Sequence, residues 1–163
     1  MTISDKGSIG ERVDESGPLI REMLTTTTTG IEVTLYEIVP DEQQVISGKL
    51  IDWADKTEVD LILTNGGTGL SQRDITPEAT LAVLQRLAPG FAEVMRIESM
   101  KKTPRGMLSR GISGTRGNTL IINLPGSPKA VRECLGAIIP SLTHGIEMLT
   151  GQASECATEN PPE

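Results

Sequence analysis

A glycine-rich loop between an apolar run and the start of a helix constrains this fold more than any other feature of the sequence. Residues 59–63 (Val-Asp-Leu-Ile-Leu) are rich in branched side chains, which is typical of a strand buried on both faces of a sheet. Residues 66–69 (Gly-Gly-Thr-Gly) follow, and Thr76 with Pro77 is typical of a helix N-cap followed by proline at the first helical position. This order predicts an α/β sheet with a ligand site at the carboxyl end of the strand.

The composition of this loop favours a phosphate-bearing ligand. A glycine backbone can approach a phosphate closely and donate its N–H groups to the oxygens, and a carboxylate at Asp74 could hold the Mg²⁺ that accompanies a nucleotide. The loop is not a P-loop, because Gly69 is followed by Leu70 rather than by Lys. It is not a dinucleotide fingerprint either, because Gln72 occupies the place of the last glycine. The alternative is a glycine-rich turn that serves packing alone.

Composition and charge narrow the class of protein. The chain has 163 residues, enough for one well-cored domain, and its single Trp, Tyr and Phe predict an aliphatic core. A net charge of −7 argues against a nucleic-acid-binding surface, which needs a basic face. Cys134 and Cys156 lack metal-ligand spacing, and two thiols in an acidic chain suggest a reducing compartment. Residues 1–5 do not form a signal peptide and no apolar run reaches membrane-spanning length, so we expect a cytoplasmic protein without membrane or nucleic-acid partners.

Strand and helix signals alternate along the chain. This alternation predicts a single α/β domain at residues 1–150, with a doubly wound, mostly parallel central sheet and helices on both faces. Residues 151–163 are expected to form a flexible C-terminal tail. We expect strands at residues 1–4, 31–39, 59–63 and 119–124, an edge strand within 107–116, helices at 18–24, 41–55, 77–87, 90–100 and 128–149, and connections at 5–17 and 25–29.

Polar loops follow each predicted strand, and in a parallel sheet these loops reach the same edge. Ser4 and Asp5 follow the first strand, Asp41 follows the second, residues 66–74 follow the third, and residues 125–127 follow the last. We therefore expect these segments to converge on one crevice at the carboxyl ends of the strands.

Several short motifs, in order from about residue 2 to residue 150, resemble the MogA/MoaB family of molybdenum-cofactor proteins, to which the G domain of gephyrin is related. The block that contains the glycine loop, Arg73-Asp74 and Thr76-Pro77 is the most specific part of this resemblance. The motifs lie at residues 4–7, 14–18, 38–42, 66–69, 73–80, 108–110, 114–117 and 121–127.

The resemblance implies a molybdopterin adenylyltransferase. Such enzymes transfer AMP from ATP to the terminal phosphate of molybdopterin with the help of Mg²⁺, release pyrophosphate, and pass the product to a molybdenum insertase. The family fold is doubly wound α/β and generally trimeric, so a homotrimer is expected. The two functionally important aspartates of the family match Asp41 and Asp74. The residues expected to bind nucleotide or molybdopterin are Ser4, Asp5, Gly66, Gly67, Thr68, Gly69, Ser109, Pro125, Gly126 and Ser127.

The chemistry of the residues agrees with this reaction. Attack of one phosphate on another requires mainly positioning and charge neutralisation, and Mg²⁺ needs only one or two carboxylates besides phosphate oxygens and water. Asp41 and Asp74 are therefore candidate catalytic residues and candidate Mg²⁺ ligands, directly or through water. Each has a structural alternative: Asp41 could cap a helix, Asp74 could bind its own backbone in a turn, and the neighbouring Arg73 could be an ordinary surface charge.

Alternatives also stay open for the whole chain. The first is a non-catalytic molybdopterin-binding or scaffold protein of the same family. The second is molybdate insertion, which is weakened because insertases carry large additional domains. The third is a generic nucleotide-binding α/β protein, which would bind ATP but not molybdopterin.

Overall fold

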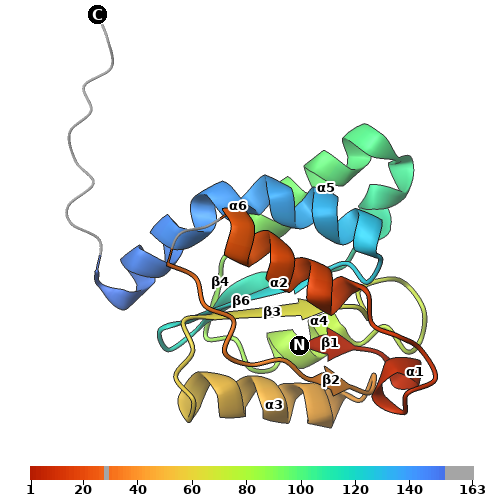
Figure 1. Ribbon diagram of the computed structural model, residues 1–163, viewed down its shortest axis with the longest axis horizontal. Coiled ribbons are helices and arrows are strands. Elements are labelled where there is room, and N and C mark those ends of the chain that lie inside the picture. Colours follow the sequence, from red (N-terminus) through yellow and green to blue (C-terminus); the bar gives the residue numbers. More distant parts are fainter. Residues whose placement is uncertain (28–29, 153–163) are drawn as a thin grey trace, which may run out of the picture.

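The carboxyl ends of four parallel strands lie along one edge of the central sheet. The computed structural model describes residues 1–27 and 30–152, and its six strands form one sheet (Figure 1). The parallel strands pair in the order β2 (Ile38–Val39), β1 (Thr2–Ile3), β3 (Leu61–Asn65) and β6 (Thr119–Leu124), and β5 (Ser113–Arg116) and β4 (Arg86–Leu87) continue the sheet with antiparallel pairing. The prediction of a mostly parallel sheet is confirmed.

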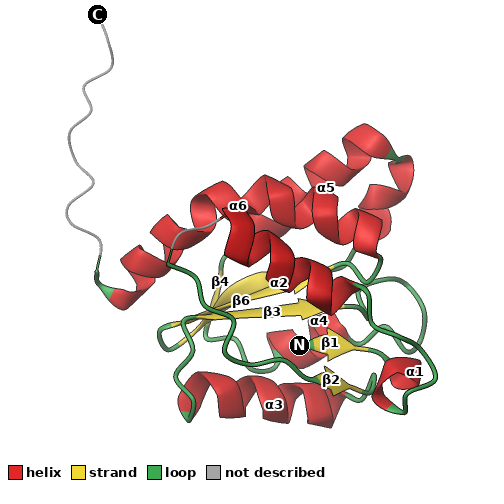
Figure 2. Cartoon of the chain, in the orientation of Figure 1, coloured by secondary structure: helices red, strands yellow, loops and turns green. Residues whose placement is uncertain are grey.

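Helices cover both faces of this sheet, as a doubly wound fold requires (Figure 2). Helices α2 (Ser16–Thr27), α5 (Pro89–Lys102) and α6 (Pro128–Thr150) pack on one face, and α3 (Gln43–Asp55) and α4 (Thr76–Leu81) pack on the other. Two short helical segments, α1 (Asp5–Ser8) and η1 (Pro104–Leu108), lie outside these layers and lead into loops. The expected single α/β domain with helices on both faces is therefore confirmed.

The core consists of two aliphatic layers separated by the sheet. The alternation of side chains along β6 places Leu120, Ile122 and Leu124 in the layer under α2, α5 and α6, and Ile121 in the layer under α3 and α4. Besides Thr119 at its start, the polar residue of this buried strand is Asn123. Its amide nitrogen donates to the hydroxyls of Thr64 (3.0 Å) and Thr80 (2.9 Å), so the polar group is satisfied within the core.

The second predicted strand is much shorter than expected. Residues 31–39 were expected to form a strand, but only Ile38 and Val39 pair with the sheet. The reason is the length of β1, whose two residues Thr2 and Ile3 pair with Ile38 and Val39. Within the described part of the chain, residues 31–37 therefore have no neighbouring strand with which to form a ladder.

Other boundaries differ for local reasons. The helix expected at 77–87 ends at Leu81, and the chain turns back to form β4 against β5. Residues 5–17 contain the short α1, because the Ser4 hydroxyl caps its first turn. The threonine run was expected to be a connection, but α2 continues to Thr27, with the hydroxyls of Thr25 and Thr26 bonded to carbonyls one turn earlier. Residues 28 and 29 lie outside the described part of the chain.

The C-terminal expectations are tested only in part. Helix α6 ends at Thr150, one residue past the predicted end. Residues 153–163, which make up most of the expected flexible tail and include Cys156, lie outside the described residues. Within residues 1–27 and 30–152, no helix has both the length and the apolarity needed to cross a membrane.

Candidate active site

The loop that follows β3 is shaped by two glycines that no other residue could replace without strain. Gly66 has φ +104°, and a Cβ at this position would lie 2.3 Å from the carbonyl oxygen of Ile3. Gly67 has φ +61°, and its Cβ would lie 2.3 Å from the Thr76 hydroxyl. That hydroxyl donates to the Gly66 carbonyl at 2.9 Å, and the Thr76 N–H donates to the Gly67 carbonyl at 3.1 Å. The loop is thus held against the first turn of α4.

Thr76 has a different role from the predicted one. The sequence suggested that it caps α4, but Ile75 precedes the helix and Thr76 is its first residue. Its side chain is fully buried and points back to the glycine loop rather than to the N–H groups of α4. The residue therefore contributes to the shape of the site and not to helix capping.

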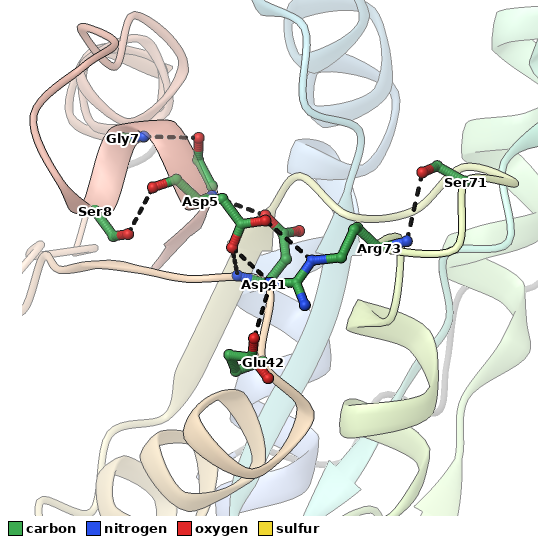
Figure 3. A network of polar contacts seen from close by, with 8 residues as sticks. Asp5, Gly7, Ser8, Asp41, Glu42, Ser71 and Arg73 are labelled. Carbon is green, nitrogen blue, oxygen red and sulfur yellow. Dashed lines mark hydrogen bonds and ion pairs between the residues drawn. The ribbon is translucent and has the colours of Figure 1, made fainter.

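Asp5 and Asp41 bind each other's backbone across the ends of β1 and β2. The Asp5 N–H donates to Asp41 Oδ2 at 2.9 Å, and the Asp41 N–H donates to Asp5 Oδ1 at 3.0 Å (Figure 3). This geometry does not support the capping alternative for Asp41. The N-cap of α3 is Glu42, which makes no side-chain cap, and the side-chain hydrogen bond of Asp41 goes to Asp5.

Arg73 joins this pair of carboxylates to the glycine loop (Figure 3). Its guanidinium donates to both carboxylate oxygens of Asp5, at 3.0 and 2.8 Å, and to Glu42 at 2.9 Å. A bidentate guanidinium–carboxylate pair fixes orientation as well as distance. Arg73 is therefore an organising residue and not the isolated surface charge that the sequence left open.

The two aspartates differ in their electrostatic state. The hydrogen bonds from Arg73 hold the pKa of Asp5 below its ordinary value. Burial raises the pKa of Asp41, and the negative charges of Asp5 and Asp74 add to that rise, against the lowering effects of the Asp5 N–H and Arg73. The raised pKa of Asp41 marks it as a carboxylate in a crowded acidic site, where an added positive charge would stabilise its ionised form.

Asp74 lies on the other side of the glycine loop. Its Oδ2 accepts the Ser71 N–H at 2.7 Å, so the turn role considered for this residue is confirmed for one oxygen. The same oxygen would lie 2.9 Å from a Cβ at Gly69, which shows how closely the carboxylate lies against the loop backbone. On the near side of the loop, Asp41 Oδ1 would lie 3.0 Å from a Cβ at Gly67. The loop therefore runs between two carboxylates.

Arg110 fixes the far side of the loop. Its Nε donates to the Gly69 carbonyl at 2.6 Å, and its two terminal nitrogens contact the Asp74 carbonyl and the Glu78 carboxylate. The Arg110 N–H also donates to the carbonyl of Thr68, which is buried, at 2.9 Å. One arginine thus connects the loop, the Asp74 backbone and the first turn of α4.

The segment after β6 forms the remaining rim. Gly126 packs against the loop, since a Cβ on it would lie 3.2 Å from the Gly66 Cα. The Ser127 hydroxyl caps α6 by accepting the Ala130 N–H at 3.3 Å. Ser109 and Pro125 line a cavity of about 190 Å³ between α5, η1 and the start of α6. The predicted binding residues after β1, β3 and β6 therefore meet at one edge of the sheet. Ser109 lies in the lining of the adjacent cavity, next to Arg110 in the sequence.

Three residues of this arrangement were not assigned roles from the sequence. Arg73 and Arg110 lie inside motifs that carried the resemblance, so their position beside Asp74 and Ser109 was the available signal. Asp14 links β1 to the start of α2. Its carboxylate accepts hydrogen bonds from the hydroxyls of Thr2 (2.5 Å) and Tyr36 (2.7 Å) and from backbone N–H groups at the start of α2. Burial would raise the pKa of Asp14, but these hydrogen bonds outweigh burial and lower it.

The carboxylates of the site fit a magnesium ion whose remaining ligands would come from the substrate and from water. Among the described residues, no three His, Cys, Asp or Glu side chains gather into a metal-binding cluster. Mg²⁺ at phosphate-transfer sites is bound through one or two carboxylates, with phosphate oxygens and water as the other ligands. Asp41 and Asp74 flank the loop where such phosphates would lie, and a cation would offset the burial and the neighbouring negative charges that raise the pKa of Asp41.

The fold and the site together define a doubly wound α/β protein with a glycine-rich loop set between two carboxylates. Comparison with known proteins gives the family. Residues 1–144 match the family described as "Probable molybdopterin binding domain", so the chain belongs to this family of molybdenum-cofactor proteins.

Individual relatives are similar to this chain over nearly its whole length. A molybdopterin adenylyltransferase of Helicobacter pylori is 42% identical over 160 residues, which cover 98% of this chain and 91% of that protein. Gephyrin of Dictyostelium discoideum is 39% identical over 168 residues, which cover 98% of this chain but 23% of gephyrin. The crystal structure of the molybdopterin biosynthesis enzyme MoaB from Thermus thermophilus superimposes with a TM-score of 0.86 at 54% identity, covering 92% of this chain and 93% of that one.

Proposed function

We propose that this protein is a molybdopterin adenylyltransferase, which transfers AMP from ATP to molybdopterin and releases pyrophosphate. The observation that carries the proposal is the position of the glycine loop between Asp41 and Asp74, in a chain whose relatives of similar length have this activity in their names. The match of residues 1–144 to the molybdopterin-binding family favours this function over that of a generic nucleotide-binding protein.

In the proposed reaction an oxygen of the terminal phosphate of molybdopterin attacks the α-phosphorus of ATP. A new P–O bond forms, the bond between the α-phosphorus and the bridging oxygen breaks, and pyrophosphate leaves with the electron pair. The attacking phosphate is already ionised near neutral pH, so the protein needs no strong general base. Its task is to hold two anionic groups in line and to neutralise their charge.

The residues divide this task between them. The N–H groups of residues 67–69 would supply donors for phosphate oxygens, whereas the Gly66 N–H already donates to the Leu124 carbonyl at 3.3 Å. Arg73 and Arg110 hold the loop in shape from its two sides. Asp41 and Asp74 would hold Mg²⁺, which supplies charge neutralisation when it is bound. Ser4, Asp5, Ser109 and the 125–127 rim are proposed to contact AMP or the pterin. A homotrimer, and transfer of the product to a molybdenum insertase, complete the proposal; gephyrin, of which this chain matches 23%, is one relative with a longer chain.

A turnover assay tests this function. Purified protein, freshly prepared molybdopterin, ATP and Mg²⁺ are mixed without oxygen, and pyrophosphate and adenylylated pterin are measured. We expect pyrophosphate release that depends on molybdopterin and falls by about 100-fold or more in Asp41→Asn and in Asp74→Asn, as for loss of a group that neutralises transition-state charge. Asp52→Asn is the matched control, because Asp52 is an exposed carboxylate on α3 whose partner is Lys56.

The assay also distinguishes a catalytic protein from a scaffold. Tight binding of molybdopterin without adenylylation would contradict catalysis and favour a carrier or scaffold. Binding of ATP without molybdopterin binding would contradict both. Light scattering after size exclusion tests the trimer separately.

A further inference from the structure

The start of helix α2 is bonded to the rim that follows β6. Ser16, the first residue of α2, is buried, and its hydroxyl donates to the Gly126 carbonyl at 2.8 Å. The two residues are 110 positions apart in the sequence. Ser16 lies in the motif at residues 14–18, to which the proposed reaction assigns no task. The bond therefore connects a segment without an assigned role to one that is proposed to contact the substrate.

The position of Ser16 is itself fixed by its neighbours. Its N–H donates to Asp14 Oδ1 at 2.9 Å. Asp14 is held in turn by the hydroxyls of Thr2 on β1 and of Tyr36. Only 3% of Ser16 is exposed, so little water can compete for its hydroxyl. The hydroxyl can therefore hold the Gly126 carbonyl in one direction.

The direction of the Gly126 carbonyl determines where the next N–H points. The peptide bond between Gly126 and Ser127 is trans, so its C=O and its N–H point to opposite sides of the chain. Because the carbonyl is directed at Ser16, the Ser127 N–H is directed away from it. Ser127 is exposed, and within residues 1–27 and 30–152 its N–H donates to no acceptor. Ser16 thus fixes the direction of a backbone donor that is unused within the described chain.

The segment that carries this donor packs against the glycine loop. The Gly66 N–H donates to the Leu124 carbonyl at 3.3 Å, and a Cβ on Gly126 would lie 3.2 Å from the Gly66 Cα. The Ser127 N–H and the N–H groups of residues 67–69 therefore belong to adjoining backbone segments at the same edge of the sheet. Backbone N–H groups are common donors to phosphate oxygens.

We propose that Ser16 is a positioning residue for substrate binding, which fixes the 126–127 peptide so that the Ser127 N–H donates to a phosphate oxygen. The inference rests on the proposed function, which supplies the two phosphate-bearing ligands, ATP and molybdopterin. Without the Ser16 hydroxyl the Gly126 carbonyl loses its donor, and the peptide turns toward another partner. The Ser127 N–H then no longer faces the phosphate.

Equilibrium binding of ATP with Mg²⁺ and of molybdopterin, each measured separately and without oxygen, tests this role. In Ser16→Ala we expect the affinity for one of the two ligands to fall about ten-fold, as for loss of a hydrogen bond to a charged group. The affinity for the other ligand should not change. The ligand that is affected identifies which phosphate the Ser127 N–H meets.

Ser47→Ala is the matched control for stability. The Ser47 hydroxyl on α3 donates to the Ala79 carbonyl at 2.8 Å, so it makes the same kind of bond between a helix and a distant backbone carbonyl. Both alanine variants should lose about 1–6 °C in melting temperature, the effect of one hydrogen bond in a domain of this size. Ser47→Ala should leave both affinities unchanged. The comparison separates a loss of stability from a loss of substrate binding.

Removal of the Ser127 N–H tests the mechanism directly. Ser127→Pro lacks this donor, and the φ of −86° and ψ of 140° at Ser127 are close to values that proline allows. Because the substitution also removes the hydroxyl that caps α6, Ser127→Ala is its reference. Ser127→Pro should bind the affected ligand about ten-fold more weakly than Ser127→Ala, a comparison that does not require Ser16→Ala to fold.

Combining the substitutions shows whether Ser16 acts through Ser127. Ser16→Ala should weaken binding about ten-fold in the Ser127→Ala background and have no effect in the Ser127→Pro background, where the N–H is already absent. A side chain that only supports the fold would weaken binding equally in both. Circular dichroism checks that each variant is folded.

Three results would overturn the inference. The first is unchanged affinity of Ser16→Ala for both ligands together with normal turnover, which would leave the proposed function intact. The second is equal affinity of Ser127→Pro and Ser127→Ala, or an equal effect of Ser16→Ala in both backgrounds, which would show that the bond is purely structural. The third is absence of binding of either ligand to the unmodified protein, which would refute the proposed function as well.

Discussion

Gly67→Ala should destabilise the protein by much more than an ordinary glycine substitution in a loop. Gly67 has φ +61°, a conformation that costs a residue with a Cβ about 1–2 kcal/mol. In addition, the new Cβ would lie 2.3 Å from the Thr76 hydroxyl and 3.0 Å from Asp41 Oδ1. Thr76 is fully buried and its hydroxyl donates to the Gly66 carbonyl, so moving it breaks a buried hydrogen bond at a cost of about 1–3 kcal/mol. The expected loss is about 2–5 kcal/mol, the sum of these two costs.

Gly10→Ala is the matched control for this prediction. Gly10 also has a positive φ, +76°, but a Cβ there would meet nothing within 4 Å. Both substitutions share the backbone strain and the entropy change of the unfolded chain, so their difference isolates the contact with Thr76. We expect Gly67→Ala to be less stable than Gly10→Ala by about 1–3 kcal/mol.

Urea unfolding followed by circular dichroism measures both variants. For a domain of this size, each kcal/mol corresponds to about 2–4 °C in melting temperature, so thermal unfolding gives an independent estimate. Equal loss of stability in the two variants would refute the reasoning, because it would show that Thr76 moves aside without cost. An unchanged molybdopterin affinity in Gly67→Ala would likewise contradict the role given to the loop.

Three more predictions concern charges. Burial lowers the pKa of the Met1 amine from about 8 to about 6, so the unfolded chain binds more protons between these pH values and the free energy of unfolding rises by about 2 kcal/mol from pH 6 to pH 8. Blocking the amine should remove this pH dependence from urea unfolding. Asp14 has a lowered pKa in the folded protein, so its stabilising effect is complete above its unfolded pKa near 3.8 and is lost as pH falls through the folded value. In Asp14→Asn, the free energy of unfolding should therefore fall less steeply with pH below about pH 4. Arg110→Lys, which loses the forked contacts to Gly69 and Asp74, should lower kcat/KM about ten-fold with an unchanged far-UV spectrum.

The sequence predicted best where local chemistry decides the structure. Residues 119–124 form β6 with the predicted bounds, because a run of buried apolar residues ends at a proline and a glycine. Helix α6 begins at Pro128 as predicted, because Ser127 caps it and proline fits its first turn. In each case the residues that set the boundary are adjacent in sequence to the element that they limit.

The sequence predicted less well where a distant segment decides the structure. Residues 31–37 alternate as a strand should, but strand formation needs a neighbour, and β1 extends only over Thr2 and Ile3. Likewise, nothing local to Arg73 shows that its partner is Asp5, 68 residues away. Pairings of this kind follow from strand order, which alternating signals restrict but do not determine.

Strand order also explains why the carboxylates of the candidate site are fixed by the backbone. Because β1 and β2 are parallel neighbours, the second residues past their ends lie side by side, and each of Asp5 and Asp41 accepts the N–H of the other. A side chain held in this way keeps its position without a partner of opposite charge. The positive charge of Arg73 is directed mainly at Asp5 and Glu42, and Asp41 keeps its raised pKa and an oxygen directed at the glycine loop. The arrangement therefore leaves Asp41 as the carboxylate that gains most from a cation arriving with the substrate.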